Sequence, residues 1–454
     1  MPIRPLRRKR AVQFPKMSIE DQTPATPASR ITELDETITE DIQPTIPNVT
    51  ELTVDDAIPQ IPALFTTLPL IRDGLITESS EMQDETVQEC LPHLAEPGGD
   101  LNIFGVSQLG RAKHVQYLHK MIRGPMPAGF TPADASRPWM VYWALTGLYL
   151  LVLSLVTVGG IEALDTIDRK GMWHFLGRMK QKSGGFSMAS GGEVDIRGAY
   201  CGMTIISLLN LPMDLPSDSP AKINGDETFL TNLKPWIRRC QTYEGGIGGA
   251  PSNEAHGAYA FCALACLSII EPPSKSITST LHMPSLISWL SSQQNAPESG
   301  FAGRTNKLVD GCYSHWVGGC WALISAALNP TSNSTQQPAD LWSRSGLARY
   351  ILCCCQNLRS GGLRDKPSKF ADSYHTCYVL AGLSAAQNIF TYQEAEKMGV
   401  AGATAAFGWS VEARGSDHIP CEYMDRVKAV HPVYVIPFEA VDEARSYFEE
   451  KGGF

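Results

Sequence analysis

The feature that most constrains the fold of this chain is an internal repeat. One pattern recurs four times at a period of about 55 to 65 residues, which is typical of architectures built from one repeated supersecondary unit. Each unit begins with apolar residues three and four apart, such as Leu230, Leu233 and Ile237, which indicate one face of an amphipathic helix. A glutamine, a glycine turn and a second, more apolar helix follow. The sequence therefore predicts a series of helix hairpins.

The glycine turns indicate where each first helix ends. Glycine adopts the left-handed backbone that stops a helix at little cost, so each turn separates two antiparallel helices. The turns follow Gln181, Gln241, Gln294 and Gln356, and the tyrosines that open the second helices are Tyr200, Tyr259, Tyr313 and Tyr378. No alternation of apolar and polar residues favours strands, so the predicted class is all-alpha.

Stacked hairpins form either an open solenoid or a closed alpha/alpha barrel. The second helices are apolar nearly all round, which indicates an inner ring, so we expect the closed barrel, or toroid. Equivalent positions of the repeat then meet at one end of a central cavity. Counted three residues before each tyrosine, these positions are Arg197, His256, Asp310 and His375.

A candidate metal site lies in this column. Asp310 and Cys312 offer a carboxylate and a thiol two residues apart, and His375 offers an imidazole from the neighbouring unit. Oxygen, sulfur and nitrogen donors together suit zinc. An isolated Asp-x-Cys is most often ordinary packing, and only its coincidence with a histidine of the column favours a metal. Three protein ligands would leave one position open, as in catalytic zinc sites.

Cationic residues stand near the same column. Arg304 and Lys307, with His256, could hold a diphosphate, although the spacing of Arg304 and Lys307 also fits a solvent-facing pair. Several aromatic residues of the second helices could wall a cavity, or they could simply belong to the core. They are Trp139, Trp143, Tyr200 and Trp316.

Composition and charge restrict the classes of protein further. A net charge of −9 argues against a general nucleic-acid binder, which needs a cationic face. Twelve cysteines without secreted-domain spacing favour a reducing compartment, and we expect a cytoplasmic protein. Residues 1–62 are rich in Pro, Thr, Asp and Glu, which predicts a disordered tail before a single domain at 63–454.

One segment raises the question of a membrane span. Residues 139–161 carry no charged side chain, and 23 apolar residues suffice to cross a bilayer. Because this stretch lies among other apolar helices of a helical core, we expect it to be buried in the protein. An integral membrane protein is the alternative, which alkaline carbonate extraction would test.

Residues 303–314 closely resemble the beta subunits of protein farnesyltransferase, and further matching segments make the resemblance specific. These segments are 135–139, 191–197, 244–249, 254–257 and 374–378. The likeness runs from about Arg111 to residues 431–434, so only the N-terminal quarter lies largely outside it. The resemblance implies an alpha/alpha barrel that works as a heterodimer with a separate helical-repeat alpha subunit. It also implies farnesyl transfer to the cysteine of C-terminal Cys-a-a-X motifs.

The resemblance also implies roles for individual residues. Asp310, Cys312 and His375 match the zinc ligands, and the substrate thiolate takes the open position. The residues that match those holding the diphosphate are His256, Arg304, Lys307 and Tyr313. Asp365 matches a carboxylate associated with magnesium at the diphosphate.

Other matches concern the isoprenoid. The residues that match its tunnel and its end are Arg197, Tyr200, Trp316, Trp139 and Trp143. In the family, bulky groups at the positions of Trp139 and Tyr378 shorten the tunnel for a fifteen-carbon chain, whereas the geranylgeranyl-transferring relative has smaller groups. This relative also carries a lysine at the position of Asp365, so both features favour farnesyl.

The sequence departs from the family in one place. Between residues 139–150 and 160–164, family members carry about one further turn-and-helix stretch, and here it is missing. We expect an internal deletion near residues 150–158, in a shortened gene model or splice form, which sequencing of the transcript would test. Such a deletion leaves barrel closure and activity open.

Three other functions are alternatives. A geranylgeranyltransferase beta subunit would share barrel, zinc and mechanism, and competing fifteen- and twenty-carbon diphosphates would separate the two. A noncatalytic helical-repeat scaffold would hold structural zinc with four protein ligands and bind no diphosphate. A terpene cyclase of similar architecture is disfavoured, because the chain has no Asp-x-Asp-Asp motif.

Overall fold

The computed structural model describes residues 75–124, 136–151, 164–329, 341–394, 403–415 and 419–452. All of them belong to one compact unit, Asp55–Phe454, and the other unit, Met1–Val54, lies outside the described residues. The predicted tail boundary at residue 62 also lies outside them and stays a prediction. Within the described ranges, no helix has both the length and the apolar character needed to cross a membrane.

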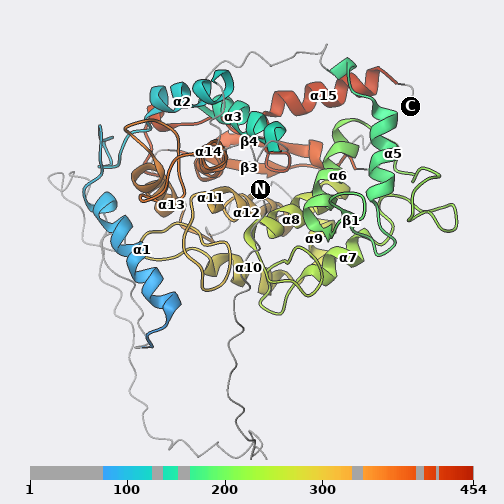
Figure 1. The fold of residues 1–454 in the computed structure, drawn as a ribbon, viewed down its shortest axis with the longest axis horizontal. Helices are drawn as coiled ribbons and strands as arrows, with labels where there is room; N and C mark the ends of the chain where they lie inside the picture. Colours follow the sequence, from blue (N-terminus) through green and yellow to red (C-terminus); the bar gives the residue numbers. More distant parts are fainter. Residues whose placement is uncertain are drawn as a thin grey trace, which may run out of the picture. The chain divides into compact units, whose positions relative to one another are not determined.

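The described residues are mostly helical (Figure 1), which confirms the predicted class. The α-helices are α1 (Glu78–Ala95), α2 (Arg111–Arg123), α3 (Arg137–Leu151), α5 (Arg169–Met179), α6 (Ile196–Leu208), α7 (Leu233–Cys240), α8 (Gly257–Ile270), α9 (Pro273–Thr280), α10 (Met283–Ser292), α11 (Tyr313–Trp316), α12 (Cys320–Leu328), α13 (Arg344–Tyr350), α14 (Ser373–Gln387) and α15 (Phe438–Glu450). Single turns of other helix types are η5 (Ile351–Cys355), η6 (Ala405–Gly408) and η8 (Tyr423–Asp425). The strands are β1 (Phe186–Ser187), β2 (Val194–Asp195), β3 (Asn388–Tyr392) and β4 (Trp409–Ala413).

The second helices of the hairpins pack against one another. Helix α14 packs between α3 and α11, and α8 packs against α6, α11 and α12. In α8 every residue except Ala258 and Tyr259 is buried, as expected for a helix that is surrounded on all sides. The first helices lie outside this group, with α2 against α3 and α13 against α14. The predicted inner ring is therefore present.

The repeated glutamines join neighbouring hairpins through their side-chain amides. Gln241 donates from Nε2 to the turn carbonyl of Gly245 (3.0 Å) and to the carbonyl of His282 (3.1 Å). Its Oε1 accepts the N–H of His282 at 2.8 Å, and His282 is the N-cap of α10. Gln294 bonds in the same way to Ser343, the N-cap of α13, at 2.8 and 2.7 Å. An amide suits this role because it both donates and accepts.

Gln356 makes the corresponding link back to the first hairpin. Its Oε1 accepts the N–H of Gly110, the N-cap of α2, at 2.8 Å, and its Nε2 donates to the carbonyl of Gln108 at 3.1 Å. The last hairpin of the series is thereby bonded to the outer helix of the first. This contact confirms the closed toroid over the open solenoid.

In the first complete unit, the glutamine position is occupied by a lysine. Lys180 pairs across the turn with Phe186, just as Gln241 pairs with Ile247 in the next unit. The repeat counted from Gln181 is therefore one residue out of register. Lys180 is almost fully buried, and its Nζ donates to the turn carbonyl of Gly184 at 2.6 Å. Burial lowers the pKa of this lysine to about 7. The lysine donates to the turn carbonyl at the position that Gln241 bonds in the next unit. Unlike a glutamine, it has no oxygen that could accept a backbone N–H of the following hairpin.

The C-terminal segment connects α3 and α6. The hydroxyl of Tyr142 on α3 donates to the carbonyl of Val435 at 3.2 Å, and that of Tyr200 on α6 donates to Val433 at 2.6 Å. Helix α15 follows this segment and packs on α6. The expected deletion at residues 150–158 lies in the sequence between α3 and α6. Apart from its first two residues, this stretch lies outside the described residues.

Two short antiparallel ladders are absent from the prediction. Strand β1 pairs with β2, and β3 pairs with β4 over five residue pairs. The long connection from Tyr392 to Trp409 hides the second ladder, because short-range hairpin signals rely on turns of a few residues. Both ladders are small additions to a helical fold.

The Gln356 link can be tested through stability. We expect Gln356→Leu to leave the part-buried N–H of Gly110 and the carbonyl of Gln108 without these partners, at a cost of up to about 1–3 kcal/mol for each group. The midpoint of urea unfolding should fall clearly. The exposed Gln393 provides the control, since Gln393→Ala should change stability by less than about 0.5 kcal/mol. Equal midpoints for the two variants would contradict a role of Gln356 in closing the barrel.

Candidate metal centre and active site

The inner helices begin at equivalent positions of the repeat. The backbone N–H of His256 donates to Ile247 at 2.9 Å, that of Asp310 to Phe301 at 3.1 Å, and that of Asp372 to the equivalent turn residue at 3.3 Å. Asp195 occupies the same position in the β1–β2 ladder, opposite Phe186. The equivalent positions are therefore Asp195, His256, Asp310 and Asp372.

This register corrects the column that was counted from the tyrosines. Only His256 and Asp310 belong to both sets, while Arg197 and His375 lie two and three residues further along the chain than Asp195 and Asp372. The tyrosines begin their helices at different depths, so a fixed offset fails in two of the four units. The available signal in the two misaligned units was an aspartate directly before the helix, Asp195 before α6 and Asp372 before α14, since aspartate is a preferred N-cap residue.

All four equivalent side chains accept a backbone hydrogen bond at the start of a helix. Asp195 accepts from Arg197 N–H (2.8 Å), His256 Nδ1 accepts from Ala258 N–H (3.1 Å), and Asp310 accepts from Cys312 N–H (2.9 Å). Asp372 accepts from His375 N–H at 2.7 Å. The N-termini of α6, α8, α11 and α14 are thus positioned by like contacts, and N-termini favour anions.

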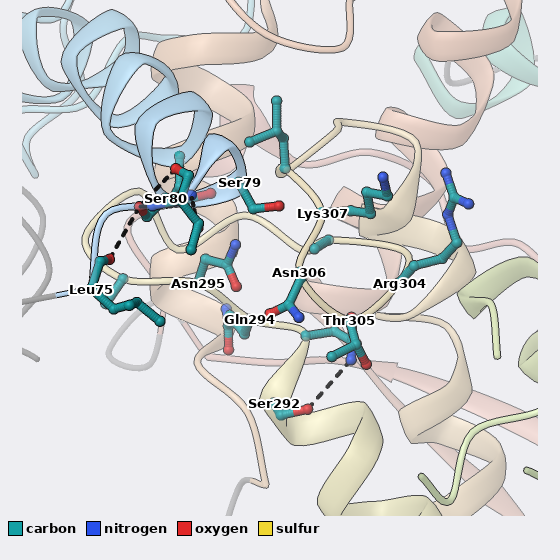
Figure 2. Close-up of a pocket in the computed structure, with 16 residues that line it drawn as sticks. Leu75, Ser79, Ser80, Ser292, Gln294, Asn295, Arg304, Thr305, Asn306 and Lys307 are labelled. Carbon is teal, nitrogen blue, oxygen red and sulfur yellow. Dashed lines mark hydrogen bonds between the residues drawn. The ribbon is translucent and has the colours of Figure 1, made fainter. Parts of the chain in front are cut away.

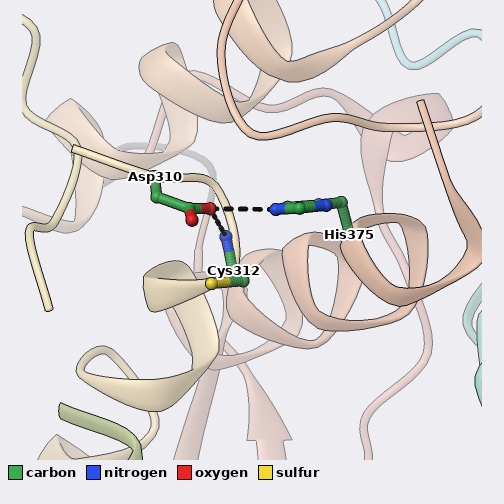
Figure 3. A group of neighbouring side chains, drawn as sticks. All are labelled: Asp310, Cys312 and His375. Carbon is green, nitrogen blue, oxygen red and sulfur yellow. Dashed lines mark hydrogen bonds and ion pairs between the residues drawn. The ribbon is translucent and has the colours of Figure 1, made fainter. Parts of the chain in front are cut away.

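The three predicted metal ligands come together (Figure 3). His375 Nε2 lies 3.1 Å from Asp310 Oδ1, and the candidate ligand atoms of Asp310, Cys312 and His375 all lie within 4.8 Å of one another. Asp310 and Cys312 belong to the turn that opens α11, and His375 to the first turn of α14. Among the described residues, no other group of acidic, histidine and cysteine side chains forms such a cluster.

The surroundings of the three residues fit a zinc ion. Asp372 Oδ2 lies 2.7 Å from His375 Nδ1, so Nδ1 donates to this carboxylate and Nε2 is left to face Asp310 and Cys312. A carboxylate behind a histidine fixes the ring and its tautomer in many zinc sites. One carboxylate, one thiol and one imidazole close to one another form a donor set that suits zinc. Because zinc takes four ligands, one coordination position would remain open.

The charges of the metal-free triad are strongly linked. Burial lowers the pKa of His375, but its hydrogen bonds with Asp310, Asp372 and Cys312, in which the two carboxylates accept, outweigh this effect and raise the pKa to about 12. Burial raises the pKa of the Cys312 thiol to about 12. Burial also raises the pKa of Asp310, yet the contact with His375 prevails and lowers it overall. Without metal, a proton on His375 holds the two carboxylates together.

His256 and Tyr313 form a second polar pair beside the triad. His256 Nε2 lies 3.1 Å from the Tyr313 hydroxyl, and burial, aided by the charge of Arg304, lowers the pKa of this histidine to about 4. Its Nδ1 already accepts from Ala258, so the proton of the neutral ring is on Nε2 and points to the Tyr313 oxygen. The hydroxyl hydrogen of Tyr313 is then available to a ligand.

Arg304 and Lys307 lie on the loop before α11. Arg304 Nη1 donates to Glu254 at 3.0 Å, and Thr305 Oγ1 donates to Glu244 at 2.5 Å, so the preceding unit holds the loop. Arg304 and Lys307 line a cavity of about 1040 Å³ between this loop and the first turns of α1, where Lys307 is exposed to solvent (Figure 2). Lys307 is thus solvent-facing, as the alternative expected, whereas Arg304 is partly buried and paired with Glu254.

Asp365 lies beside the metal triad and is paired with its neighbour. Lys366 Nζ is 2.7 Å from Asp365 Oδ1, and both side chains are largely buried. Burial raises the pKa of Asp365, and the charge of Asp310 raises it further, against the lowering effect of Lys366. The carboxylate therefore shares the electrostatic environment of the triad.

Aromatic rings lead away from the triad on one side. Trp139 stacks on Trp143 with ring centroids 6.4 Å apart, and Trp143 meets the edge of Tyr374 at 5.2 Å. Tyr374 precedes His375 in the sequence and accepts a hydrogen bond from the Trp316 indole at 3.0 Å. Trp139 is half exposed, so the alternative that this ring belongs to the core does not hold.

The aromatic series continues across the inner helices. Trp316 packs on Tyr378 at 4.4 Å and on Phe261 at 5.7 Å, and Phe261 meets the edge of Tyr200 at 5.9 Å. Helices α14, α11, α8 and α6 each contribute at least one of these rings. The rings form a continuous apolar wall that begins next to the triad.

Arg197 lies in the first turn of α6, where Asp195 holds its side chain. Asp195 accepts two hydrogen bonds from its guanidinium, both at 2.8 Å, and the guanidinium lies 5.5 Å from the Tyr259 ring centre. These bonds raise the pKa of Arg197, so the guanidinium stays charged.

Four residues near the predicted site escaped the sequence reasoning. Asp372 and Asp195 lie at N-cap positions and orient His375 and Arg197, while Lys366 and Glu254 hold Asp365 and Arg304. Lys366 follows Asp365 directly, but adjacency in sequence does not indicate an ion pair. The two N-cap aspartates were readable from the sequence, and the two ion pairs were not.

Comparison with known proteins defines the class. The profile of the family described as "Prenyltransferase alpha-alpha toroid domain" matches residues 109–153 and 149–436. A solved structure of Candida albicans protein geranylgeranyltransferase-I complexed with GGPP has a similar fold. It is 19% identical with a TM-score of 0.55, over 75% of this chain and 99% of that one, and it bears on the fold alone. The chain is a prenyltransferase toroid protein.

Two curated relatives narrow the family. The protein farnesyltransferase subunit beta of Pyricularia oryzae is 47% identical over 445 aligned positions, covering 87% of this chain and 85% of the relative. That of Schizosaccharomyces pombe is 33% identical, covering 82% of this chain and 97% of the relative. The chain belongs to the protein farnesyltransferase beta-subunit family.

The protonated state of the triad predicts how zinc binding depends on pH. Both His375 and Cys312 carry a proton below their pKa values of about 12, and zinc must displace both. We expect the apparent Zn²⁺ affinity to increase with pH by up to about 100-fold per unit between about pH 6.5 and 7.5. Chelator competition measures this affinity, and an indicator dye measures the released protons. An affinity independent of pH would contradict the assigned protonation.

Proposed function

We propose that this chain is the catalytic beta subunit of a protein farnesyltransferase. It transfers the farnesyl group of farnesyl diphosphate to the cysteine of C-terminal Cys-a-a-X motifs, in a heterodimer with a helical-repeat alpha subunit. The observation that carries the proposal is the contact of Asp310, Cys312 and His375 beside a continuous aromatic wall. A metal-binding triad next to an apolar wall suits a reaction between a thiol and a prenyl chain.

The proposed zinc ligands are Asp310, Cys312 and His375. Zinc bound there would lower the pKa of the substrate thiol and present it as a thiolate. Asp372 keeps the His375 ring oriented for this purpose through its 2.7 Å contact with Nδ1. Zinc with three protein ligands retains a position for the thiol, whereas four would make the site structural.

We assign the diphosphate to the cationic side of the centre. Tyr313 turns its hydroxyl hydrogen outward because His256 donates to its oxygen, and Arg304 stands close enough to affect the pKa of both. Arg304, Lys307, His256 and Tyr313 would stabilise the negative charge that develops on the diphosphate as the carbon–oxygen bond breaks. The N-termini of α8 and α11 add to the same field.

The isoprenoid would lie along the aromatic wall. Its proposed contacts are Trp139, Trp143, Arg197, Tyr200, Trp316 and Tyr378. Trp139 and Tyr378 are bulky, and their packing against Trp143 and Trp316 limits the room for a longer chain. We therefore favour the fifteen-carbon group over the twenty-carbon group of a geranylgeranyltransferase.

Asp365 would take part in holding Mg²⁺ at the diphosphate, since carboxylates are preferred magnesium ligands. We place the reaction in the cytoplasm. All twelve cysteines are free thiols in the structure, and eleven of them are buried, which suits a reducing compartment.

The test uses this chain co-expressed with a farnesyltransferase alpha subunit. We expect one zinc per heterodimer and transfer of farnesyl, in preference to geranylgeranyl, when the two diphosphates compete for a Cys-a-a-X peptide. Cys312→Ala should lose zinc and turnover while it retains farnesyl diphosphate. Preference for the twenty-carbon donor would favour the geranylgeranyltransferase alternative. Zinc without diphosphate binding would favour the scaffold.

The diphosphate assignment gives a separate prediction. Lys307→Ala removes an exposed cation from the loop before α11, so the dissociation constant of farnesyl diphosphate should rise about tenfold, with zinc content unchanged. Lys170 is an exposed lysine on α5, and Lys170→Ala serves as the matched control. Fluorescence titration of both heterodimers measures the constants. The assignment is wrong if the two variants bind equally well.

A further inference from the structure

Lys366 makes an ion pair with Asp365, and the proposed reaction gives Lys366 itself no role. Its Nζ lies 2.7 Å from Oδ1 and 2.8 Å from Oδ2 of Asp365, so both carboxylate oxygens are engaged. The side chains of Lys366 and Asp365 are only 8% and 17% exposed. A pair removed from water in this way is held firmly, because loss of either partner leaves a buried charge uncompensated.

The backbone of Asp365 is fixed against the loop that carries two metal ligands. Its carbonyl accepts the N–H of Gly311 at 2.9 Å, and Gly311 lies between Asp310 and Cys312. The Tyr350 hydroxyl donates to the same carbonyl at 2.9 Å. With the main chain held, only the side-chain torsions of Asp365 decide where its carboxylate points.

Two further acidic residues are therefore joined to the elements that carry the three proposed ligands, Asp372 through its contact with His375 and Asp365 through its backbone bond to Gly311. Asp372 is committed to His375, since it accepts from both the backbone N–H and Nδ1 at 2.7 Å. Asp365 is committed to Lys366. Zinc with three protein ligands completes its coordination with a fourth donor, so an uncommitted carboxylate at this place would compete with the substrate thiolate.

We propose that Lys366 is a positioning residue that holds Asp365 away from the metal, and that it thereby keeps the fourth coordination position open for the thiolate. The inference rests on the proposed zinc chemistry and extends it to a residue with no ligand contact of its own. Without Lys366, a metal bound by the triad would offer the Asp365 carboxylate another cation. A centre with four protein ligands would result, the closed arrangement of structural zinc sites.

The experiment uses the heterodimer with an alpha subunit, loaded with Co²⁺ in place of zinc. Absorption reports the coordination, because a Cys-a-a-X peptide adds a thiolate-to-cobalt charge-transfer band when its sulfur binds. In Lys366→Met we expect metal affinity to rise about tenfold and the peptide concentration for half-maximal band growth to rise by a similar factor. Adding Asp365→Asn to Lys366→Met should restore both values. The exposed Lys369 supplies the control Lys369→Met, which should match the wild type.

The outcomes separate this inference from the proposed function. If the wild type shows no peptide-dependent band, the open position does not exist and both are overturned. If the wild type shows the band and Lys366→Met shows it at the same peptide concentration, only the role of Lys366 is overturned. Should Lys366→Met fail to assemble, Lys366→Gln takes its place, because glutamine keeps one hydrogen bond but loses the charge. Lys366→Gln should then shift both values in the same direction, and wild-type values would overturn the role.

Discussion

The side-chain amides of the repeated glutamines are the contacts on which the rest of the structure depends. Gln241 and Gln294 each join the turn of one hairpin to the N-cap of the next outer helix, and Gln356 returns to Gly110 at the start of the series. Because an amide both donates and accepts, each link fixes the distance and the direction of the next helix. A ring built from such links closes with its inner helices beginning at one end.

That common end explains why chemistry gathers there. Asp195, His256, Asp310 and Asp372 repeat one structural position, and their differences in residue type give this position different chemical properties. Asp310 belongs to the proposed metal triad, His256 contacts the Tyr313 hydroxyl, and Asp372 orients a histidine one turn on. The remaining N-cap, Asp195, holds an arginine. The N-terminal partial charges of the helices make the same end receptive to an anion.

The sequence predicted the class of fold and the barrel, since periodicity carries that information. Residue type pointed to Asp310, Cys312 and His375 as a metal triad, although His375 entered the set through the tyrosine count, whose register the structure corrects. The prediction was less complete where three-dimensional register decides. His256 and Asp310 were aligned correctly because their tyrosines follow at one spacing, whereas Asp195 and Asp372 were missed because theirs do not. Lys180 in a glutamine position was missed because the repeat was counted from its neighbour Gln181. The β3–β4 ladder was missed because a long connection separates its two strands. The pairing of Lys366 with Asp365 depends on side-chain direction, which adjacency leaves open.

The contact of the C-terminal segment with α3 and α6 has a consequence for biosynthesis. The bond from Tyr200 to Val433 spans 233 residues, and that from Gly110 to Gln356 spans 246. Contacts this distant in sequence form slowly, because a long loop must close before they stabilise anything. A ribosome releases Val433 only after all the inner helices, so these apolar helices emerge before the segment that joins α3 and α6 can bind them. Until then the nascent chain exposes apolar helix faces, the condition in which aggregation competes with folding.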